Sequence, residues 1–338
     1  MIRVITTLVV LLSALAPLSP ARADGTSPPA GRDVKEEKPA PGTTGNGSWA
    51  VAPATTSKTL TPRLRFTLEG RAGDVINDTV RIWNLTGKKM KFEVYGADGY
   101  NTARDGAFAL RGEEEPQKGI GRWTKVGSRE VSVPAGRAVD VPFIVSIPPN
   151  ATPGDHIGGV VVANKEVEAV KQTGGAVLGL RRAVGARIYL RLEGSLVPGA
   201  RVEDLRVRNT EPELPWGSPV GTVIRYRIVN VGNVRLTPTA QIRATGLFGR
   251  VLRDFPERAM PELLPGEDVE VELKWPGAPP ADAVKVTVEL KTQVGLQSVA
   301  RTSYVSLPWQ TLVSVLALVL AVALLLRLRR HLIARRNA

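Results

Sequence analysis

The chain has no cysteine and only two histidines among its 338 residues. The absence of cysteine excludes disulfides and thiolate metal sites, so an exported domain of this chain depends on its apolar core for stability. His331 lies in the C-terminal tail, and His156 enters a strand after a turn. Asp155 could orient His156 as a base, but no nucleophile motif accompanies the pair, so a structural histidine is the favoured interpretation.

Other chemical signatures are missing as well. The three carboxylates of Glu113–Glu115 lack the spacing of a metal loop and are typical of a solvated charge run. No glycine-rich phosphate loop follows a strand and opens a helix. The sequence therefore predicts no catalytic residues, no metal and no cofactor, and an enzyme is the weakest of the functional hypotheses.

Helical periodicity is almost absent before residue 309, and alternation of apolar and polar residues takes its place. The clearest example is the segment 139–147, in which every second residue is apolar, as expected of a strand with one buried face. The turn sequence 134–137 precedes this strand, and the proline- and glycine-rich sequence 148–155 ends it. A second strand then begins at Ile157, which is the pattern of an antiparallel sandwich.

The strand pattern divides into two halves that repeat one plan. The sequence Ile82–Gly87 corresponds to Ile228–Asn233, and Pro134–Val141 corresponds to Pro265–Val271. Short strands at this spacing predict an all-β protein with two tandem immunoglobulin-like β-sandwiches, at residues 59–195 and 196–306.

The N-terminal residues 1–23 have the features of a secretory signal peptide. Arg3 supplies the positive start, an apolar run follows, and Ala21-Arg22-Ala23 forms a small-x-small cleavage site. An uncleaved N-terminal anchor is the alternative. Residues 24–58 are rich in Pro, Gly, Ser and Thr, and this composition predicts a disordered linker.

An apolar run near the C-terminus, Trp309–Leu326, predicts a transmembrane α-helix within residues 307–326. The tail 327–338 is basic and contains five arginines. By the positive-inside rule the chain is a single-pass cell-membrane protein with extracellular N-terminal domains and a cytoplasmic C-terminus. Seven of the 45 basic residues lie in leader and tail, which leaves 38 against 32 acidic residues and argues against nucleic acid as a partner.

Aromatic residues make up only 5% of the chain. Trp83, Tyr95 and Tyr189 occupy strand positions opposite to the aliphatic ones, so alternation would face them outward as candidate binding residues. The alternative is that they pack under the long polar segment Gly96–Thr124 or in the interface between the domains. A loop of that length is usually functional or disordered.

The first domain also resembles a known family. The resemblance rests on Trp123, on the segments Val131–Gly136 and Ile147–Val160, and on the closing strand Val184–Gly194. These are similar to the peptidoglycan domain of WxL-type cell-surface proteins, and the resemblance covers about Leu60 to Gly194. That family has a signal peptide, two immunoglobulin-like domains, one C-terminal span and a basic tail. The resemblance implies a cell-envelope binding role, with peptidoglycan as the ligand of the first domain. It assigns no particular binding residues in this chain.

Together these features predict a non-enzymatic binding protein of the bacterial cell surface, anchored in the membrane by Trp309–Leu326. Its partner would be peptidoglycan or a secreted envelope protein. The alternative is a structural or assembly partner, similar to a chaperone, that adds a strand to another surface protein through an exposed sheet edge.

Overall fold

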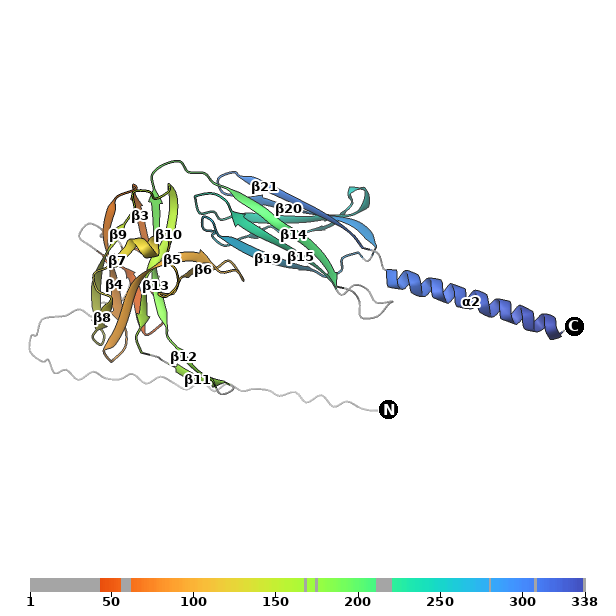
Figure 1. The fold of residues 1–338 in the computed structure, drawn as a ribbon, viewed down its shortest axis with the longest axis horizontal. Coiled ribbons are helices and arrows are strands. Elements are labelled where there is room, and N and C mark those ends of the chain that lie inside the picture. Colours follow the sequence, from red (N-terminus) through yellow and green to blue (C-terminus); the bar gives the residue numbers. More distant parts are fainter. Residues whose placement is uncertain are drawn as a thin grey trace, which may run out of the picture. The chain divides into compact units, whose positions relative to one another are not determined.

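The computed structural model describes residues 43–55, 62–166, 169–173, 176–210, 221–279, 281–306 and 309–336. Strands dominate these residues, and the C-terminal element is a long helix (Figure 1). The predicted all-β class with a C-terminal apolar helix is therefore confirmed. The predicted signal peptide lies outside the described residues, as does the linker up to residue 42.

Two sheets face each other in the N-terminal half of the described chain, which we call the first sandwich. One sheet has the order β1 (Thr44–Gly45), β2 (Trp49–Pro53), β4 (Val75–Asn84), β9 (Ala138–Ser146) and β7 (Thr124–Val126). The other has the order β3 (Phe66–Gly70), β13 (Ala183–Leu192), β10 (Gly154–Asn164), β5 (Met90–Asn101) and β6 (Phe108–Leu110), with β8 (Glu130–Val133) paired to β5. All pairs are antiparallel except β3 with β13.

The core of the first sandwich lies between these sheets. Phe66, Phe92 and Phe143 are fully buried there, and the rings of Phe66 and Phe143 meet edge to face with centroids 4.9 Å apart. The alternation predicted for residues 139–147 is observed, because Val141, Phe143 and Val145 all belong to this core. Aliphatic side chains from both sheets fill the space around the rings.

The predicted disordered linker 24–58 is wrong over Trp49–Pro53. This stretch is strand β2, all five of its residues are buried, and it pairs with β4. Trp49 is 0% exposed and its ring lies 5.4 Å from that of Phe92. The small side chains of Ala50 and Ala52 let the other face of β2 be covered by Trp83, so the strand is buried on both faces despite its polar surroundings.

The segment Gly96–Thr124 is also more ordered than predicted. Strand β5 continues to Asn101, β6 returns beside it, and a single helical turn, α1 (Ile120–Trp123), precedes β7. In the polar part of the segment Glu113 forms an ion pair with Arg129, and Glu115 lies 3.4 Å from Arg111.

The second sandwich follows after residue 199. One sheet contains β14 (Ala200–Thr210), β15 (Gly221–Asn230) and β19 (Asp268–Trp275). The other contains β17 (Val251–Asp254), β16 (Thr239–Thr245), β20 (Asp282–Lys291) and β21 (Gln297–Ser306), with β18 (Arg258–Ala259) on β16 and a 3₁₀ turn, η1 (Leu247–Gly249), between β16 and β17. A separate core of aliphatic residues, with Phe255 and Trp275, fills the space between them.

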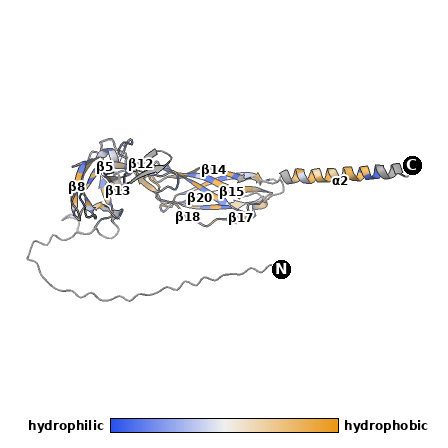
Figure 2. Ribbon diagram, turned by 90° about the horizontal axis from the view of Figure 1, so that it is seen from below, coloured by the Kyte–Doolittle hydropathy of each residue, from blue (hydrophilic) through white to orange (hydrophobic). Residues whose placement is uncertain are grey.

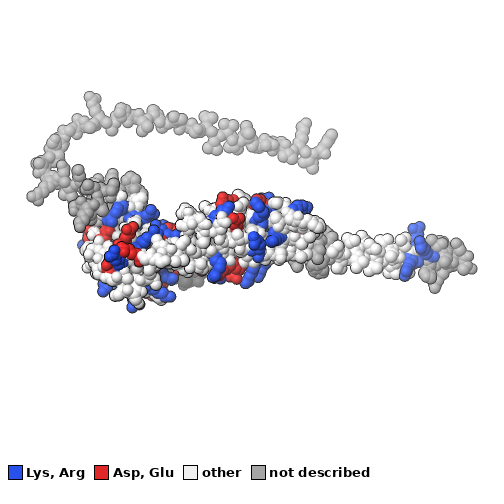
Figure 3. Space-filling model, turned by 90° about the horizontal axis from the view of Figure 1, so that it is seen from above, with Lys and Arg blue, Asp and Glu red and all other residues white. Residues whose placement is uncertain are grey.

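A two-stranded hairpin, β11 (Ala169–Thr173) and β12 (Ala176–Leu180), connects β10 to β13. The helix α2 (Trp309–Arg336) contains the segment Leu312–Arg330, which is long and apolar enough to span a membrane. Figure 2 colours many of the residues of α2 as hydrophobic. Figure 3 shows acidic and basic side chains intermixed on the sandwiches, whereas α2 carries a basic group only toward its C-terminal end.

Candidate functional site

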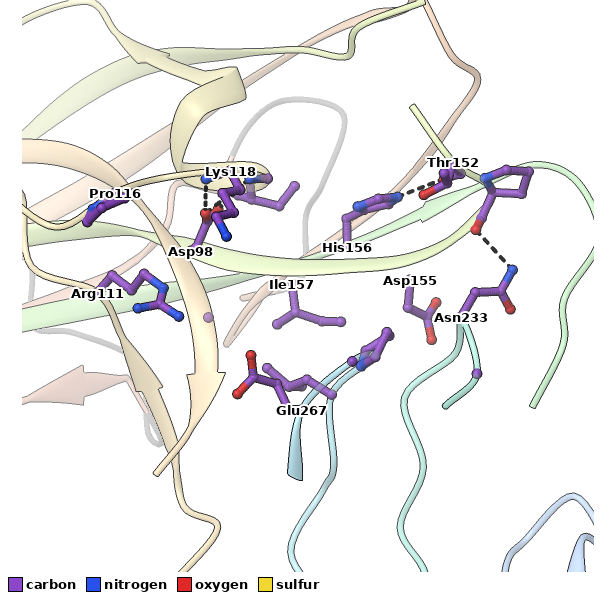
Figure 4. Close-up of a pocket in the computed structure, with 18 residues that line it drawn as sticks. Asp98, Arg111, Pro116, Lys118, Thr152, Asp155, His156, Ile157, Asn233 and Glu267 are labelled. Carbon is purple, nitrogen blue, oxygen red and sulfur yellow. Dashed lines mark hydrogen bonds between the residues drawn. The ribbon is translucent and has the colours of Figure 1, made fainter. Parts of the chain in front are cut away.

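A cleft of about 640 Å³ lies where the two sandwiches meet (Figure 4). It is lined on one side by the end of β5, the segment 116–120 and the start of β10, and on the other by the turns at residues 232–233 and 264–267. We first consider which of its polar groups are already used within the protein, because only the others are available to a ligand.

Asp155 joins the two sandwiches at one end of the cleft. Its carboxylate accepts two hydrogen bonds from the Arg191 guanidinium, at 2.7 and 3.0 Å, and one from the N–H of Arg235 at 3.0 Å. Burial opposes ionisation of this carboxyl, but these donors outweigh it and lower the pKa of Asp155 below its ordinary value. Asp155 therefore has a structural role. It does not orient His156, although the sequence suggested that it could.

Asn233 strengthens the same junction. Its side-chain amide donates to the carbonyl oxygens of Pro153 and Ser195, and its Oδ1 accepts from the N–H of Val197. The backbone N–H of Asp155 donates to the carbonyl oxygen of Asn233 at 2.8 Å. These bonds fix the connection between the sandwiches.

Asn101 and Tyr189 hold the other side of the junction. Asn101 is buried, donates to the carbonyl oxygen of Glu262 at 2.7 Å, and accepts from the N–H of Leu264 at 2.9 Å. The Tyr189 hydroxyl donates to the Glu262 carboxylate at 2.9 Å, and Arg235 stacks over the Tyr189 ring at 4.4 Å. These groups of the junction therefore already have partners within the protein.

The helical turn α1 is held by a buried carboxylate. Asp98 accepts hydrogen bonds from the N–H groups of Lys118, Gly119 and Gly121. These bonds satisfy the carboxylate and set the path of residues 118–121, while the Lys118 side chain stays exposed. Lys118 therefore remains at the rim of the cleft without a described ion-pair partner (Figure 4).

A groove of about 760 Å³ continues from this rim along the first sandwich. It is lined by three basic side chains, Lys118, Arg122 and Lys125, and none of the described lining residues is acidic. No ion pair is described for any of the three, whereas surface arginines such as Arg81 are paired, in that case to Asp140 at 2.6 Å. We call these residues the basic groove.

An aromatic pair lines the basic groove. The rings of Trp123 and His156 lie 4.7 Å apart at a tilt of 51°. His156 Nε2 lies 2.8 Å from the carbonyl oxygen of Thr152, which fixes the ring (Figure 4). This placement is consistent with the structural histidine that the sequence favours, and it adds an apolar face beside the three cations.

A second candidate surface is an incompletely paired edge of β13. Strand β3 pairs with β13 only over Ile188–Leu192, and no described strand pairs with the same edge of Ala183–Arg187. The Asn164 N–H donates to the Arg182 carbonyl oxygen, so alternate residues from Arg182 onward direct their backbone groups toward β10. The residues between them, among them Ala183 and Gly185, direct theirs toward the uncovered edge.

A groove of about 480 Å³ lies against this edge, which we call the β13 groove. Tyr95, Val161 and Gly185 stand side by side across three neighbouring strands and form part of its floor. Leu110 lies over the floor, and a Cβ atom at Gly185 would come within 2.4 Å of Leu110 Cδ1. A side chain at position 185 would therefore require the Leu110 side chain to move.

The three predicted binding residues do not form one site. Tyr95 and Tyr189 both line the β13 groove, and burial raises the pKa of Tyr95 above its ordinary value, although the charge of Arg181 opposes this shift. Trp83 belongs to the opposite sheet and is covered by Ala50, Ala52 and Ala138. Tyr189 faces away from its own core as predicted, but the second sandwich buries it, which is the interface alternative raised above.

Sequence reasoning did not identify the basic groove, because Lys118, Arg122 and Lys125 occur in an irregular segment with no motif. The i, i+4 spacing of Lys118 and Arg122 was the available signal, but it acquires meaning only once α1 is known to exist. The uncovered edge of β13 depends on where β3 stops, and the sequence does not specify that.

No protein-family model matches the chain, and no curated protein matches it either. Solved structures with a similar arrangement include a chain from a chaperone–tip adhesin complex of CFA/I fimbriae, with 11% identity over 71% of this chain and 96% of that chain at a TM-score of 0.35. The class 5 fimbriae chaperone CfaA has 12% identity over 72% of this chain and 98% of its own at 0.33. A chain from the SafA pilin–SafB chaperone complex of Salmonella enterica has 12% identity over 71% of this chain and 92% of that chain, with a TM-score of 0.30. We base no functional argument on likeness at this level.

Proposed function

We propose that this protein is a membrane-anchored, non-enzymatic binding protein of the cell envelope that holds another exported protein by strand addition to β13. The observation that carries the proposal is that no described strand pairs with the Ala183–Arg187 edge of β13 beside the β13 groove. In strand addition the incoming segment pairs its backbone with the edge, and its alternate side chains enter the adjacent groove.

The groove suggests what kind of segment it would take. Its floor is apolar at Tyr95 and Val161, and two arginines flank it. Arg187 lies over the Phe108 ring at 4.3 Å and Arg65 over the Tyr189 ring at 5.3 Å, with no carboxylate partner described for either. An extended segment with alternating apolar residues and at least one acidic residue fits this surface.

Helix α2 supplies the anchor in this proposal. Its segment Leu312–Arg330 is long enough to cross a bilayer, and the arginines at positions 327, 329 and 330 follow its apolar part. The positive-inside rule then places the C-terminus in the cytoplasm and both sandwiches outside.

Photo-crosslinking in intact cells tests the proposal. A photoreactive amino acid at Ala183, on the uncovered edge, should yield one dominant protein adduct. The control position is Lys285, which is exposed but lies on a strand paired on both sides. Equal adducts at both positions, or a broad mixture at Ala183, would contradict strand addition.

A matched pair of variants tests the backbone contact itself. Ala183→Pro removes an N–H that faces the uncovered edge and leaves the bonds to β10 in place, so the adduct should be lost while the thermal midpoint changes little. The crosslinker is then placed at Arg187. Ala183→Ser keeps the N–H and should retain the adduct.

A second candidate function, binding of peptidoglycan or another anionic wall polymer, is favoured by the basic groove. Its three cations have no described ion-pair partner and suit carboxylate or phosphate groups, and the Trp123–His156 pair suits a sugar ring. Retention of the detergent-solubilised protein on purified cell wall should fall when Lys118, Arg122 and Lys125 are changed to Ala. The control removes the same charge at Lys88, Lys89 and Lys91, and an equal loss there would reduce this function to non-specific attraction.

A further inference from the structure

The turn between β16 and β17 presents an apolar tip to solvent. Phe248 is fully exposed at 104%, and its neighbour Leu247 is 54% exposed. A large apolar side chain that stays exposed to water gains no stabilisation from burial. The tips of exposed turns usually carry polar residues instead.

The backbone of Phe248 adds a second anomaly. Its φ is +56°, in the left-handed region that glycine and asparagine adopt most easily. Among the described residues only one other non-glycine residue, Asp204, has a positive φ. Folding alone would therefore favour a smaller residue at position 248, and phenylalanine there indicates a contact outside the sandwich.

A buried carboxylate fixes this tip. Asp282 accepts hydrogen bonds from the N–H of Leu247 at 2.9 Å and from the guanidinium of Arg250 at 2.8 Å. The Leu247 bond is the largest of the effects that lower the pKa of Asp282, so the carboxylate stays charged at neutral pH. These bonds hold Leu247 and Arg250, the residues on either side of the Phe248–Gly249 turn, against Asp282.

The register of the sheet locates the tip relative to α2. Asp282 is paired with Ser306, the last residue of β21. Helix α2 begins at Trp309, three residues further on, and three residues span at most about 11 Å. The end of the second sandwich that carries Phe248 is therefore the end from which the apolar helix departs.

We propose that Leu247 and Phe248 form a second membrane contact, in which the tip enters the interfacial layer of the bilayer that α2 crosses. This inference rests on the proposed membrane insertion of α2. Aromatic side chains are favoured at the headgroup level, and an apolar tip beside a membrane span meets that level without any change of fold. The contact fixes the membrane-proximal end of the second sandwich against the lipid surface.

The absence of cysteine allows a direct test with single-cysteine variants of the full chain in liposomes of phosphatidylcholine and phosphatidylglycerol. An environment-sensitive fluorophore is attached at Phe248→Cys, and nitroxide-labelled lipids serve as quencher. The control is Val294→Cys, an apolar residue that is 59% exposed in the β20–β21 turn, at the far end of strands roughly 30 Å long. A third position, Val313→Cys in α2, reports insertion of the helix.

The proposal expects strong quenching at positions 248 and 313 and little at 294. Quenching at 313 alone overturns the membrane contact of the tip and leaves the anchor intact. Equal quenching at 248 and 294 shows adsorption of the whole sandwich and also overturns the proposal. No quenching at 313 removes the anchor, and the inference falls with it.

Discussion

Asn84 and Asn230 occupy the same position in the two sandwiches, each at the end of a strand and each almost fully buried. The Asn84 amide donates to the carbonyl oxygens of Lys88, Val133 and Pro134, and the Asn230 amide donates to those of Val234 and Leu263. In both, Oδ1 accepts the N–H two residues further on, from Thr86 and Gly232 respectively. One asparagine thus joins three chain segments in each sandwich.

Loss of either side-chain amide should be costly, because several buried carbonyl oxygens lose their donor at once. We expect Asn84→Ala and Asn230→Ala each to reduce the free energy of unfolding by roughly 2–4 kcal/mol. Urea unfolding followed by tryptophan fluorescence measures this. Asn77→Ala, an exposed position on the same strand as Asn84, should change it by less than about 0.5 kcal/mol. A loss at Asn84 no larger than at Asn77 would contradict the role assigned to the amide.

The junction at Asp155 makes a prediction about pH. Because the folded-state pKa of Asp155 is lowered, its contribution to stability is fully present above the unfolded pKa of about 3.9 and is lost as the pH falls through the folded value. Asp155→Asn should reduce the free energy of unfolding by roughly 1–3 kcal/mol at pH 7 and should flatten its decline below pH 4. Chemical unfolding between pH 2.5 and 7 measures both effects. An unchanged acid profile in Asp155→Asn would show that other carboxyl groups cause the decline.

Strand β2 makes a prediction about where the first sandwich begins. Trp49 packs against Phe92 in the core, so Trp49→Ala should cost roughly 3–5 kcal/mol, and Trp49→Phe less, since the ring contact is partly kept. A chain that begins at residue 59, the boundary expected from composition, should be less stable than one that begins at residue 43. Thermal unfolding of the two chains compares them directly. Equal midpoints would mean that β2 is dispensable.

The sequence identified the alternating strands and the repeat, because each depends on residues close together in the chain. The corresponding turns are observed: Gly136 and Gly266 both have positive φ, and Ile82 pairs with Val139 as Ile228 pairs with Val269. Strand β2 escaped detection because it is buried on both faces and therefore has no alternation. Its alanines and its proline-rich surroundings concealed it further.

The junction residues could not be predicted for a different reason. Asp155 and Asn233 stand in turn sequences, where Asp and Asn are common without any partner. Their bonds join residues about 80 positions apart and exist only once both sandwiches have formed. Tyr189 illustrates the limit. Alternation gave its direction correctly, but Leu264 of the other sandwich buries its ring, and its hydroxyl donates to Glu262, 73 residues away.

The proposed topology can be measured with the same cysteine-free background. A single cysteine at Ser303, exposed on β21 in the second sandwich, should react with a membrane-impermeant maleimide in intact cells. A cysteine at Asn337 in the basic tail should react only after the cells are permeabilised, because the arginines that precede it favour the cytoplasmic side. The wild-type chain gives no background in this assay, since it contains no cysteine. Labelling at Asn337 before permeabilisation would place the tail outside, and the strand-addition proposal would then have to be considered for a partner in the cytoplasm.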